Sequence, residues 1–185
     1  MGTDKALMTW QGRRLAQFAI DLATALNLQV FLSVQDLRRE EFQIAFQDCG
    51  IIPDVNGLSL HGPVKGILSA HLRFPSEDWL VLSCDMPLLT QSLGRELIEC
   101  HRQFPDAAAC LYTKQGMVEP LFGVYTSTAL RYWFLQDETA RLQQSGMKYL
   151  LSQVQVKTIP LDKKYHSFFL NANSPSDLEA AILKK

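Results

Sequence analysis

Residues 79–85, with the sequence WLVLSCD, form an uninterrupted apolar run that ends on an aspartate, and Pro87 follows closely. A continuous apolar run of this length is typical of a buried strand whose two faces are both covered. Strands of that kind belong mainly to parallel sheets, which need helices on both faces. This run therefore constrains the fold more than any other segment of the chain.

Strand patterns alternate with helical patterns along the rest of the chain. The predicted strands are 28–34, 49–54, 79–85, 107–113, 119–125 and 154–160. The predicted helices are 13–26, 36–47, the later part of 61–72, 91–104, 126–136 and 139–151. Pro120 is expected to place its strand at an edge or at a strand start. The alternation predicts an α/β fold with a mainly parallel sheet, helices on both faces and right-handed crossovers.

Length and composition limit the function classes. The 185 residues suit a single domain, and the 18 basic and 19 acidic residues leave a net charge of −1. This balance argues against a protein that coats nucleic acid or an anionic membrane. No stretch is long and apolar enough for a membrane span, and the four cysteines lack zinc-site spacing. We therefore expect a cytoplasmic protein with reduced thiols.

Ligands of such sheets bind beyond the carboxyl ends of the strands, and two groups of residues fall there. Asp85 follows the buried strand directly, and a carboxylate at that place suits Mg²⁺; the alternative is an aspartate that caps the next helix or turn. Gly62 and Gly66 bracket Pro63 and Lys65 at a helix start, where backbone N–H groups favour an anion. Taken alone, this second group is also consistent with a plain turn.

Two further segments carry weaker signals. Lys5 could meet a phosphate as a point charge, but a lysine near a chain end is more often solvated. Asn171 and Asn173 precede the predicted C-terminal helix, where asparagine commonly forms turns and caps. No histidine or serine lies in a context that supports a nucleophilic triad.

Taken together and in order, these segments resemble the molybdenum cofactor guanylyltransferase family. The matching segments are GTDKALMTWQGRRL, IIPD, HGPVKGILSA, LSCDMPLL, EPLFGVY and LNANSPSDL, from residue 2 to about residue 180. The resemblance implies a three-layer nucleotidyltransferase domain with a Rossmann-like sheet. It also implies an activity, the Mg²⁺-dependent transfer of GMP from GTP to molybdopterin with release of pyrophosphate.

The resemblance assigns roles to the catalytic and metal-binding positions. Lys5 matches a lysine that contacts nucleotide phosphate, and Asp85 matches the magnesium-binding aspartate. Asn171 and Asn173 match an N-x-N pair near the metal and the pterin side of the cleft. The same resemblance implies that molybdenum cofactor biosynthesis proteins or acceptor molybdoenzymes are the protein partners.

The resemblance also assigns the nucleotide-binding positions. Asp54 matches an acidic residue on the guanine and ribose side. Gly62 and Gly66 match a G-P-L-A-G loop, in which Lys65 replaces the usual small residue.

One departure from the family concerns the N-terminus. The family opens with a strand that ends in L-A-G-G-x-S-x-R before M-G-x-D-K, whereas residue 1 here lies inside that motif. We therefore expect residues 1–185 to lack the first strand and the phosphate loop, either because translation starts upstream or because the protein is shortened and impaired. Two alternatives to GMP transfer stay open: a related nucleotidyltransferase that uses CTP or a sugar phosphate, and a nucleotide- or pterin-binding protein without turnover.

Overall fold

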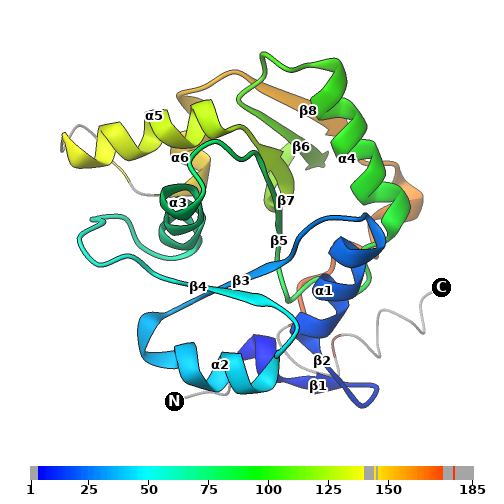
Figure 1. The fold of residues 1–185 in the computed structure, drawn as a ribbon. Coiled ribbons are helices and arrows are strands. Elements are labelled where there is room, and N and C mark those ends of the chain that lie inside the picture. The colour runs from blue at the N-terminus through cyan, green and yellow to red at the C-terminus, as the bar shows by residue number, and fades with distance from the viewer. Residues whose placement is uncertain (1–3, 140–143, 145, 173–176, 178–185) are drawn as a thin grey trace.

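The computed structural model describes residues 4–139, 144, 146–172 and 177. Helices and strands alternate along this part of the chain (Figure 1). The α-helices are α1 (Leu15–Ala25), α2 (Arg39–Ala45), α3 (Pro63–Arg73), α4 (Gln91–Gln103), α5 (Ser127–Glu138) and α6 (Met147–Ser152). The strands are β1 (Thr9–Trp10), β2 (Arg13–Arg14), β3 (Phe31–Val34), β4 (Gly50–Pro53), β5 (Trp79–Leu82), β6 (Ala109–Lys114), β7 (Met117–Tyr125) and β8 (Val156–Pro160). Three 3₁₀ turns, η1 (Lys5–Leu7), η2 (Asp36–Arg38) and η3 (Lys163–Tyr165), complete the set.

The largest sheet has the strand order β5-β7-β6-β8. Strand β7 runs antiparallel to both of its neighbours, whereas β6 and β8 are parallel. Because β7 reverses direction between them, β5, β6 and β8 all point the same way. The α/β class with a Rossmann-like sheet is confirmed, and β7 makes the sheet a mixed one.

Pro120 is the fourth residue of β7, which is an interior strand, so the prediction of an edge or a strand start is wrong. The regular pairing of β6 with β7 is interrupted between Leu111 and Thr113. The pairing of β7 with β5 extends only as far as Phe122. Since Pro120 lies outside both regular stretches, its missing N–H removes no ladder hydrogen bond.

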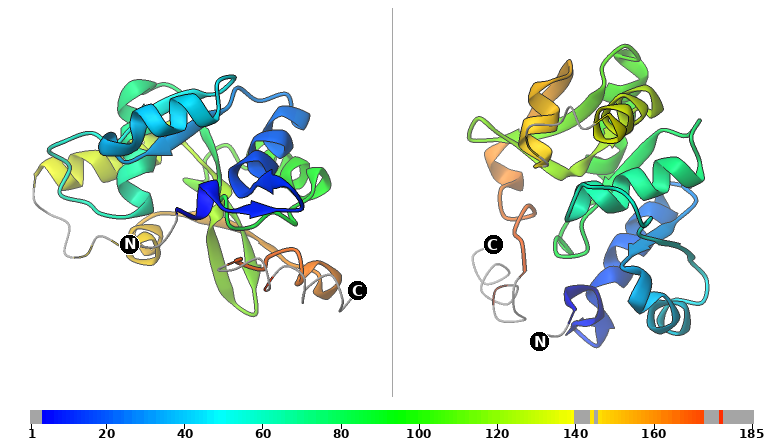
Figure 2. Two further views of the ribbon diagram at one scale, coloured as in Figure 1. Left: turned by 90° about the horizontal axis from the view of Figure 1, so that it is seen from below. Right: turned by 90° about the vertical axis from the view of Figure 1, so that its left-hand side faces the viewer.

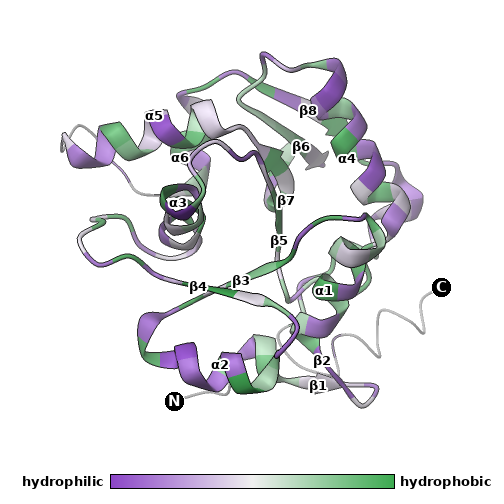
Figure 3. Ribbon diagram, viewed as in Figure 1, coloured by the Kyte–Doolittle hydropathy of each residue, from purple (hydrophilic) through white to green (hydrophobic). Residues whose placement is uncertain are grey.

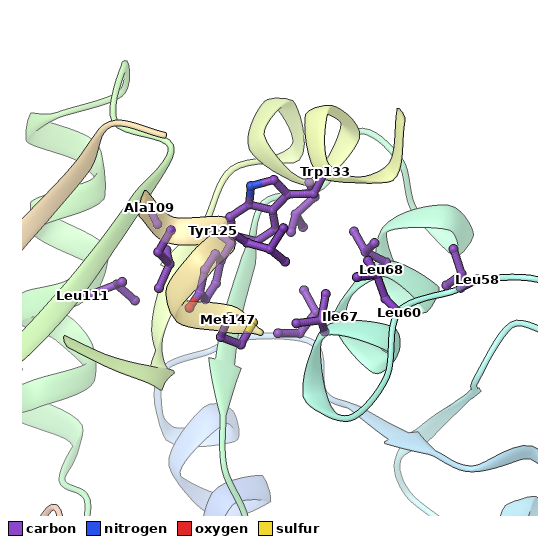
Figure 4. Close-up of a cluster of buried hydrophobic side chains, with 13 residues drawn as sticks. Leu58, Leu60, Ile67, Leu68, Ala109, Leu111, Tyr125, Trp133 and Met147 are labelled. Carbon is purple, nitrogen blue, oxygen red and sulfur yellow. The ribbon is translucent and has the colours of Figure 1, made fainter. Parts of the chain in front are cut away.

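Side chains of this sheet alternate between two apolar cores. On one face Ala109, Leu111 and Tyr125 pack against α3, α5 and α6, with Trp133 fully buried among them (Figure 4). On the other face Tyr112 and its neighbours pack against α4 and the segment that follows β8. The two-residue period of the strands thus places a helical layer on each side of the sheet.

Strands β3 and β4 form a separate parallel pair, covered by α1 and α2. A small β1–β2 hairpin precedes α1, and its turn at Gln11 and Gly12 has positive φ at both residues. The sequence analysis did not predict this hairpin. Figures 1 and 2 place it beside α1 and η1, far from α5.

Most predicted elements are present with shorter bounds. The segment 36–47 begins as the 3₁₀ turn η2 before α2, and the strand predicted over 28–34 starts only at Phe31. Part of the helix predicted over 139–151 and most of the C-terminal helix lie outside the described residues. The four cysteines, all inside the described part, form no disulfide. None of the helices described here is long and apolar enough to cross a membrane.

Candidate active site at the carboxyl ends of the strands

The predicted site residues lie where strands end. Asp54 follows β4, and its backbone N–H donates to the Val34 carbonyl at the end of β3, 2.8 Å away. Asp85 comes three residues after β5 ends at Leu82. Since β3, β4 and β5 all end on this side, the fold gathers polar residues from separate segments at one edge.

The Asp85 carboxylate is held by two side chains. Lys5 Nζ lies 3.2 Å from Asp85 Oδ2, and Ser83 Oγ donates to Asp85 Oδ1 at 2.5 Å. The Asp85 side chain is only 17% exposed, whereas that of Lys5 is 42% exposed. The carboxylate is therefore fixed in direction, and the Lys5 side chain beside it is partly exposed.

The η1 turn places Lys5 beside Asp85. Asp4 caps this turn, because its side chain accepts a hydrogen bond from the Ala6 N–H at 2.9 Å. Arg38 at the end of η2 pairs with Asp4 and also with Glu41 at 2.8 Å. These contacts tie two segments more than thirty residues apart and fix the start of the turn that carries Lys5.

The pKa of the Cys84 thiol reflects the same surroundings. Burial, together with the negative charges of Asp85 and Asp4, raises this pKa to about 11. Cys84 is thus a neutral thiol at physiological pH and adds no charge next to Asp85.

A cavity of about 440 Å³ adjoins this pair, and Asp54, Gly62, Gly66, Ser83 and Cys84 are among its lining residues. Burial raises the pKa of the Asp54 carboxyl, and the positive charge of Lys65 partly offsets that effect. The structure therefore brings Asp54 and both glycines to one cavity, with Asp85 and Lys5 directly beside it through Ser83 and Ala6.

The local structure requires a glycine at both position 62 and position 66. Gly62 caps α3 with φ of +63°, a conformation that strains any other residue, and it offers no side-chain acceptor to the first turn of the helix. In that turn Pro63 has no N–H, and the Lys65 N–H donates to the Gly62 carbonyl at 3.1 Å, so the turn offers few donors to an anion. At Gly66 a Cβ would overlap Ser33 Oγ and lie 3.7 Å from Asp54 Oδ1, so glycine allows α3 to approach β3.

The asparagine pair is only partly described. Asn171 is exposed, and Asn173 lies outside the described residues. Between them, the Ala172 N–H donates to the Asp85 carbonyl at 2.7 Å. This contact brings the segment of Asn171 to the end of β5, across a sequence separation of more than eighty residues.

Sequence reasoning missed three residues of this region: Ser83, Arg38 and Glu119. Burial raises the pKa of the Glu119 carboxyl, and the nearby charge of Asp85 raises it as well. The EPL segment and an acid inside an apolar strand were the signals for Glu119. Arg38 carries no local signal, because only the folded chain brings it to Asp4. Ser83 did carry one, since it lies two residues before Asp85.

The donor set fits a hard cation. Mg²⁺ is commonly bound by one or two carboxylates together with substrate phosphates, and a fixed, partly exposed carboxylate at Asp85 meets that need. Within the described residues no group of three or more acidic, histidine or cysteine side chains forms a complete metal cage. Asp85 would therefore hold a cation only together with a phosphorylated ligand.

A Rossmann-like sheet with a lysine–aspartate pair at its carboxyl edge is suited to binding a nucleotide, and the family model shows that the chain is a nucleotidyltransferase. A family model described as "MobA-like NTP transferase domain" matches residues 1–158. The chain belongs to this family, and the resemblance drawn from its sequence segments is confirmed.

Relatives and solved structures agree with this assignment. A Synechocystis "Molybdenum cofactor biosynthesis bifunctional protein" is 33% identical over 96% of this chain, which spans about half (48%) of that relative. A Bacillus subtilis "Probable molybdenum cofactor guanylyltransferase" is 29% identical over 95% of this chain and 85% of the relative. The structure of molybdopterin-guanine dinucleotide biosynthesis protein A from Archaeoglobus fulgidus is similar in fold, with a TM-score of 0.76, 20% identity and coverage of 97% of this chain and 89% of that one.

Proposed function

We propose that the protein transfers GMP from GTP to molybdopterin with release of pyrophosphate, and that it requires Mg²⁺. The observation that carries the proposal is the Lys5–Asp85 pair, which lies beside the cavity lined by Asp54 and Gly62. The family and the names of two relatives, one of them a molybdenum cofactor guanylyltransferase, support the choice of substrates.

In this reaction a terminal phosphate oxygen of molybdopterin attacks the α-phosphorus of GTP. A new P–O bond forms, the bond from the α-phosphorus to the bridging oxygen breaks, and pyrophosphate takes the electron pair. The protein contributes positioning and charge compensation and forms no covalent bond. When bound, Mg²⁺ would neutralise charge on the phosphate oxygens.

Each residue has a defined part in that arrangement. Asp85, oriented by Ser83, would hold the cation, and Lys5 would offset phosphate charge. Gly62 and Gly66 would border the bound nucleotide, and Asp54 would face the guanine and ribose. Asn171 and Asn173 would orient the phosphate of the pterin.

The test measures pyrophosphate release from GTP and molybdopterin with and without Mg²⁺, in the wild type and in Asp85→Asn. We expect the variant to lose at least about 100-fold in rate, the usual effect of removing one preorganised electrostatic group. Asp48→Asn, at an exposed aspartate outside the site, is the matched control and should keep full activity. Equal rates in Asp85→Asn and wild type would remove Asp85 from the mechanism.

Nucleotide choice is tested separately by thermal unfolding with GTP or CTP. A ligand at one hundred times its dissociation constant adds about 2.7 kcal/mol to the free energy of unfolding. We expect GTP to raise the unfolding temperature and CTP to leave it unchanged. Stabilisation by CTP alone would contradict guanylyl transfer and favour a cytidylyltransferase.

A further inference from the structure

The turn that carries Lys5 is short and is held from its first end. Turn η1 has three residues, of which Ala6 is buried. The Asp4 carbonyl accepts hydrogen bonds from the Leu7 and Met8 N–H groups at 3.0 and 3.2 Å. Because Asp4 supplies these acceptors, the place of Lys5 at the sheet edge depends on where Asp4 lies.

The Asp4 side chain serves two partners at once. One oxygen, Oδ1, accepts the hydrogen bond from the Ala6 N–H at 2.9 Å, and the other, Oδ2, pairs with the Arg38 guanidinium. Lys5 lies between the capping residue and the capped amide, so a rotation of Asp4 would move the Lys5 backbone. The carboxylate that pairs with Arg38 is therefore the same group that directs Lys5.

The Arg38 guanidinium is itself fixed by α2. Its Nε and Nη2 groups donate to Glu41 Oε2 at 3.0 and 2.8 Å, which leaves Nη1 for Asp4. The guanidinium also lies over the ring of Phe42, 5.4 Å from its centroid, and Phe42 is buried in the core beneath α2. Figure 3 shows hydrophilic and hydrophobic residues alternating along α2, as expected for a helix with one face on the core. Arg38 is thus a preorganised anchor at the start of a packed helix.

The contact between Arg38 and Asp4 should matter for geometry more than for stability. The two side chains are 29% and 30% exposed, and ion pairs that are partly exposed contribute little to the free energy of unfolding. In contrast, Lys5 Nζ lies 3.2 Å from Asp85 across a sequence separation of 80 residues. A displacement of about 1 Å in an active site can cost about 100-fold in rate, so the place of the turn is critical.

We propose that Arg38 is a positioning residue of the active site, which acts through Asp4 on Lys5. It holds Asp4 in place, and Asp4 fixes the turn that presents the Lys5 ammonium group beside Asp85, where the nucleotide phosphates would lie. In this arrangement Arg38 itself contacts neither the nucleotide nor the cation. This role rests on the proposed function, because Lys5 affects turnover only if a phosphorylated ligand binds beside Asp85.

Substitutions that keep or remove the charge of Arg38 test this role. Arg38→Met keeps an aliphatic stem over Phe42 and loses the charge, whereas Arg38→Lys keeps a stem and a point charge for Asp4. We expect pyrophosphate release from GTP and molybdopterin to fall at least tenfold in Arg38→Met and to stay within threefold of wild type in Arg38→Lys. Arg39→Met, at the exposed arginine that begins α2, is the matched control and should keep the wild-type rate. Equal rates in Arg38→Met and Arg38→Lys would overturn the proposal.

A double substitution separates an action through Lys5 from a general loss of structure. In a protein that already carries Lys5→Met, Arg38→Met should change the remaining rate by less than twofold. A full tenfold loss in that background would mean that Arg38 acts by another route. The midpoint of thermal unfolding should shift by less than about 4 °C in Arg38→Met, because the ion pair is partly exposed. A larger shift would assign Arg38 to stability and contradict a positioning role.

Amide hydrogen exchange gives a readout that needs no substrate. The Ala6 N–H is bonded to the Asp4 carboxylate, so release of that carboxylate should expose it. We expect exchange at Ala6 to be at least tenfold faster in Arg38→Met than in the wild type and in Arg39→Met. Unchanged exchange would overturn the proposal whatever reaction the protein catalyses. Failure of the proposed function is distinguishable, because the wild type would then release no pyrophosphate, while faster exchange in Arg38→Met would still support control of the turn by Arg38.

Discussion

Strands β5 and β6 have comparably apolar sequences, but they have different surroundings. Strand β6 has β7 on one side and β8 on the other, and its first four residues are fully buried. Strand β5 has β7 on one side only, and all four of its residues are partly exposed. An apolar sequence therefore predicts that a strand is buried, but the burial that is observed depends on whether a strand pairs with each of its two edges.

The largest expected difference between the two strands comes from removing a leucine side chain from each. Leu111→Ala in β6 leaves a cavity in the closed core and should lower the free energy of unfolding by about 3–4 kcal/mol. Leu80→Ala in β5 removes a side chain that already lines a cavity and should cost about 1–2 kcal/mol. Urea unfolding of both variants provides the measurement. Equal losses would show that β5 is packed as tightly as β6, contrary to the comparison.

A smaller difference in the free energy of unfolding is expected between alanine substitutions at two glycines, one in each sheet. A Cβ at Gly123 in β7 would overlap Leu111 and lie 2.9 Å from the Cys110 carbonyl oxygen, and this backbone cannot easily move. A Cβ at Gly50 in β4 would meet only the ring of Phe31, which borders the cavities beside β3. Gly123→Ala should therefore cost about 2–3 kcal/mol, near the upper end for overpacking, and Gly50→Ala about 1 kcal/mol.

Thermal or urea unfolding of the two alanine variants tests this order. If Gly50→Ala proved the more damaging of the two, Phe31 would have no room to move and the open region would be rigid.

The smallest effect concerns pH and the cavity next to β3. The pKa of Asp54 is raised in the folded state above its usual value of 3.8, mainly by burial. Between the pKa of the unfolded chain and the raised pKa of the folded protein, Asp54 keeps its proton in the folded state and has lost it in the unfolded state. The free energy of unfolding therefore falls as pH rises through this interval. Asp54→Asn removes this dependence, and the stability of the wild type relative to the variant should decline over that interval.

Urea unfolding at several pH values from 3.5 upwards provides the measurement. Glu119→Gln is the parallel case in the large sheet, because the pKa of Glu119 is raised in the same direction, and wild-type stability relative to this variant should also decline with rising pH. A wild-type stability that rises relative to Asp54→Asn over this interval would mean that the carboxylate form is favoured by the fold.

Local sequence patterns were sufficient to predict most of the helices and strands and part of the candidate site. The apolar run before Asp85 predicted β5, and the glycines around Pro63 predicted the start of α3. The pairing of β7 was not predictable from its sequence, since Pro120 suggested an edge and the irregular register that accommodates it forms only with β6. Arg38 was missed for the same reason, because its partner Asp4 comes from a distant segment of the chain, whereas Ser83 lies only two residues before its partner Asp85 and was simply overlooked.

The amino-acid sequence by itself determined the alternation of strands and helices, the carboxylate after β5 and the membership in a nucleotidyltransferase family, because each is written in contiguous residues. Only the tertiary structure decided that Lys5 lies 3.2 Å from Asp85, that β7 is interior and that β3 and β5 face each other unpaired. Contacts between distant segments depend on how the whole chain packs, and the local sequence of a strand contains no information about which strands lie beside it.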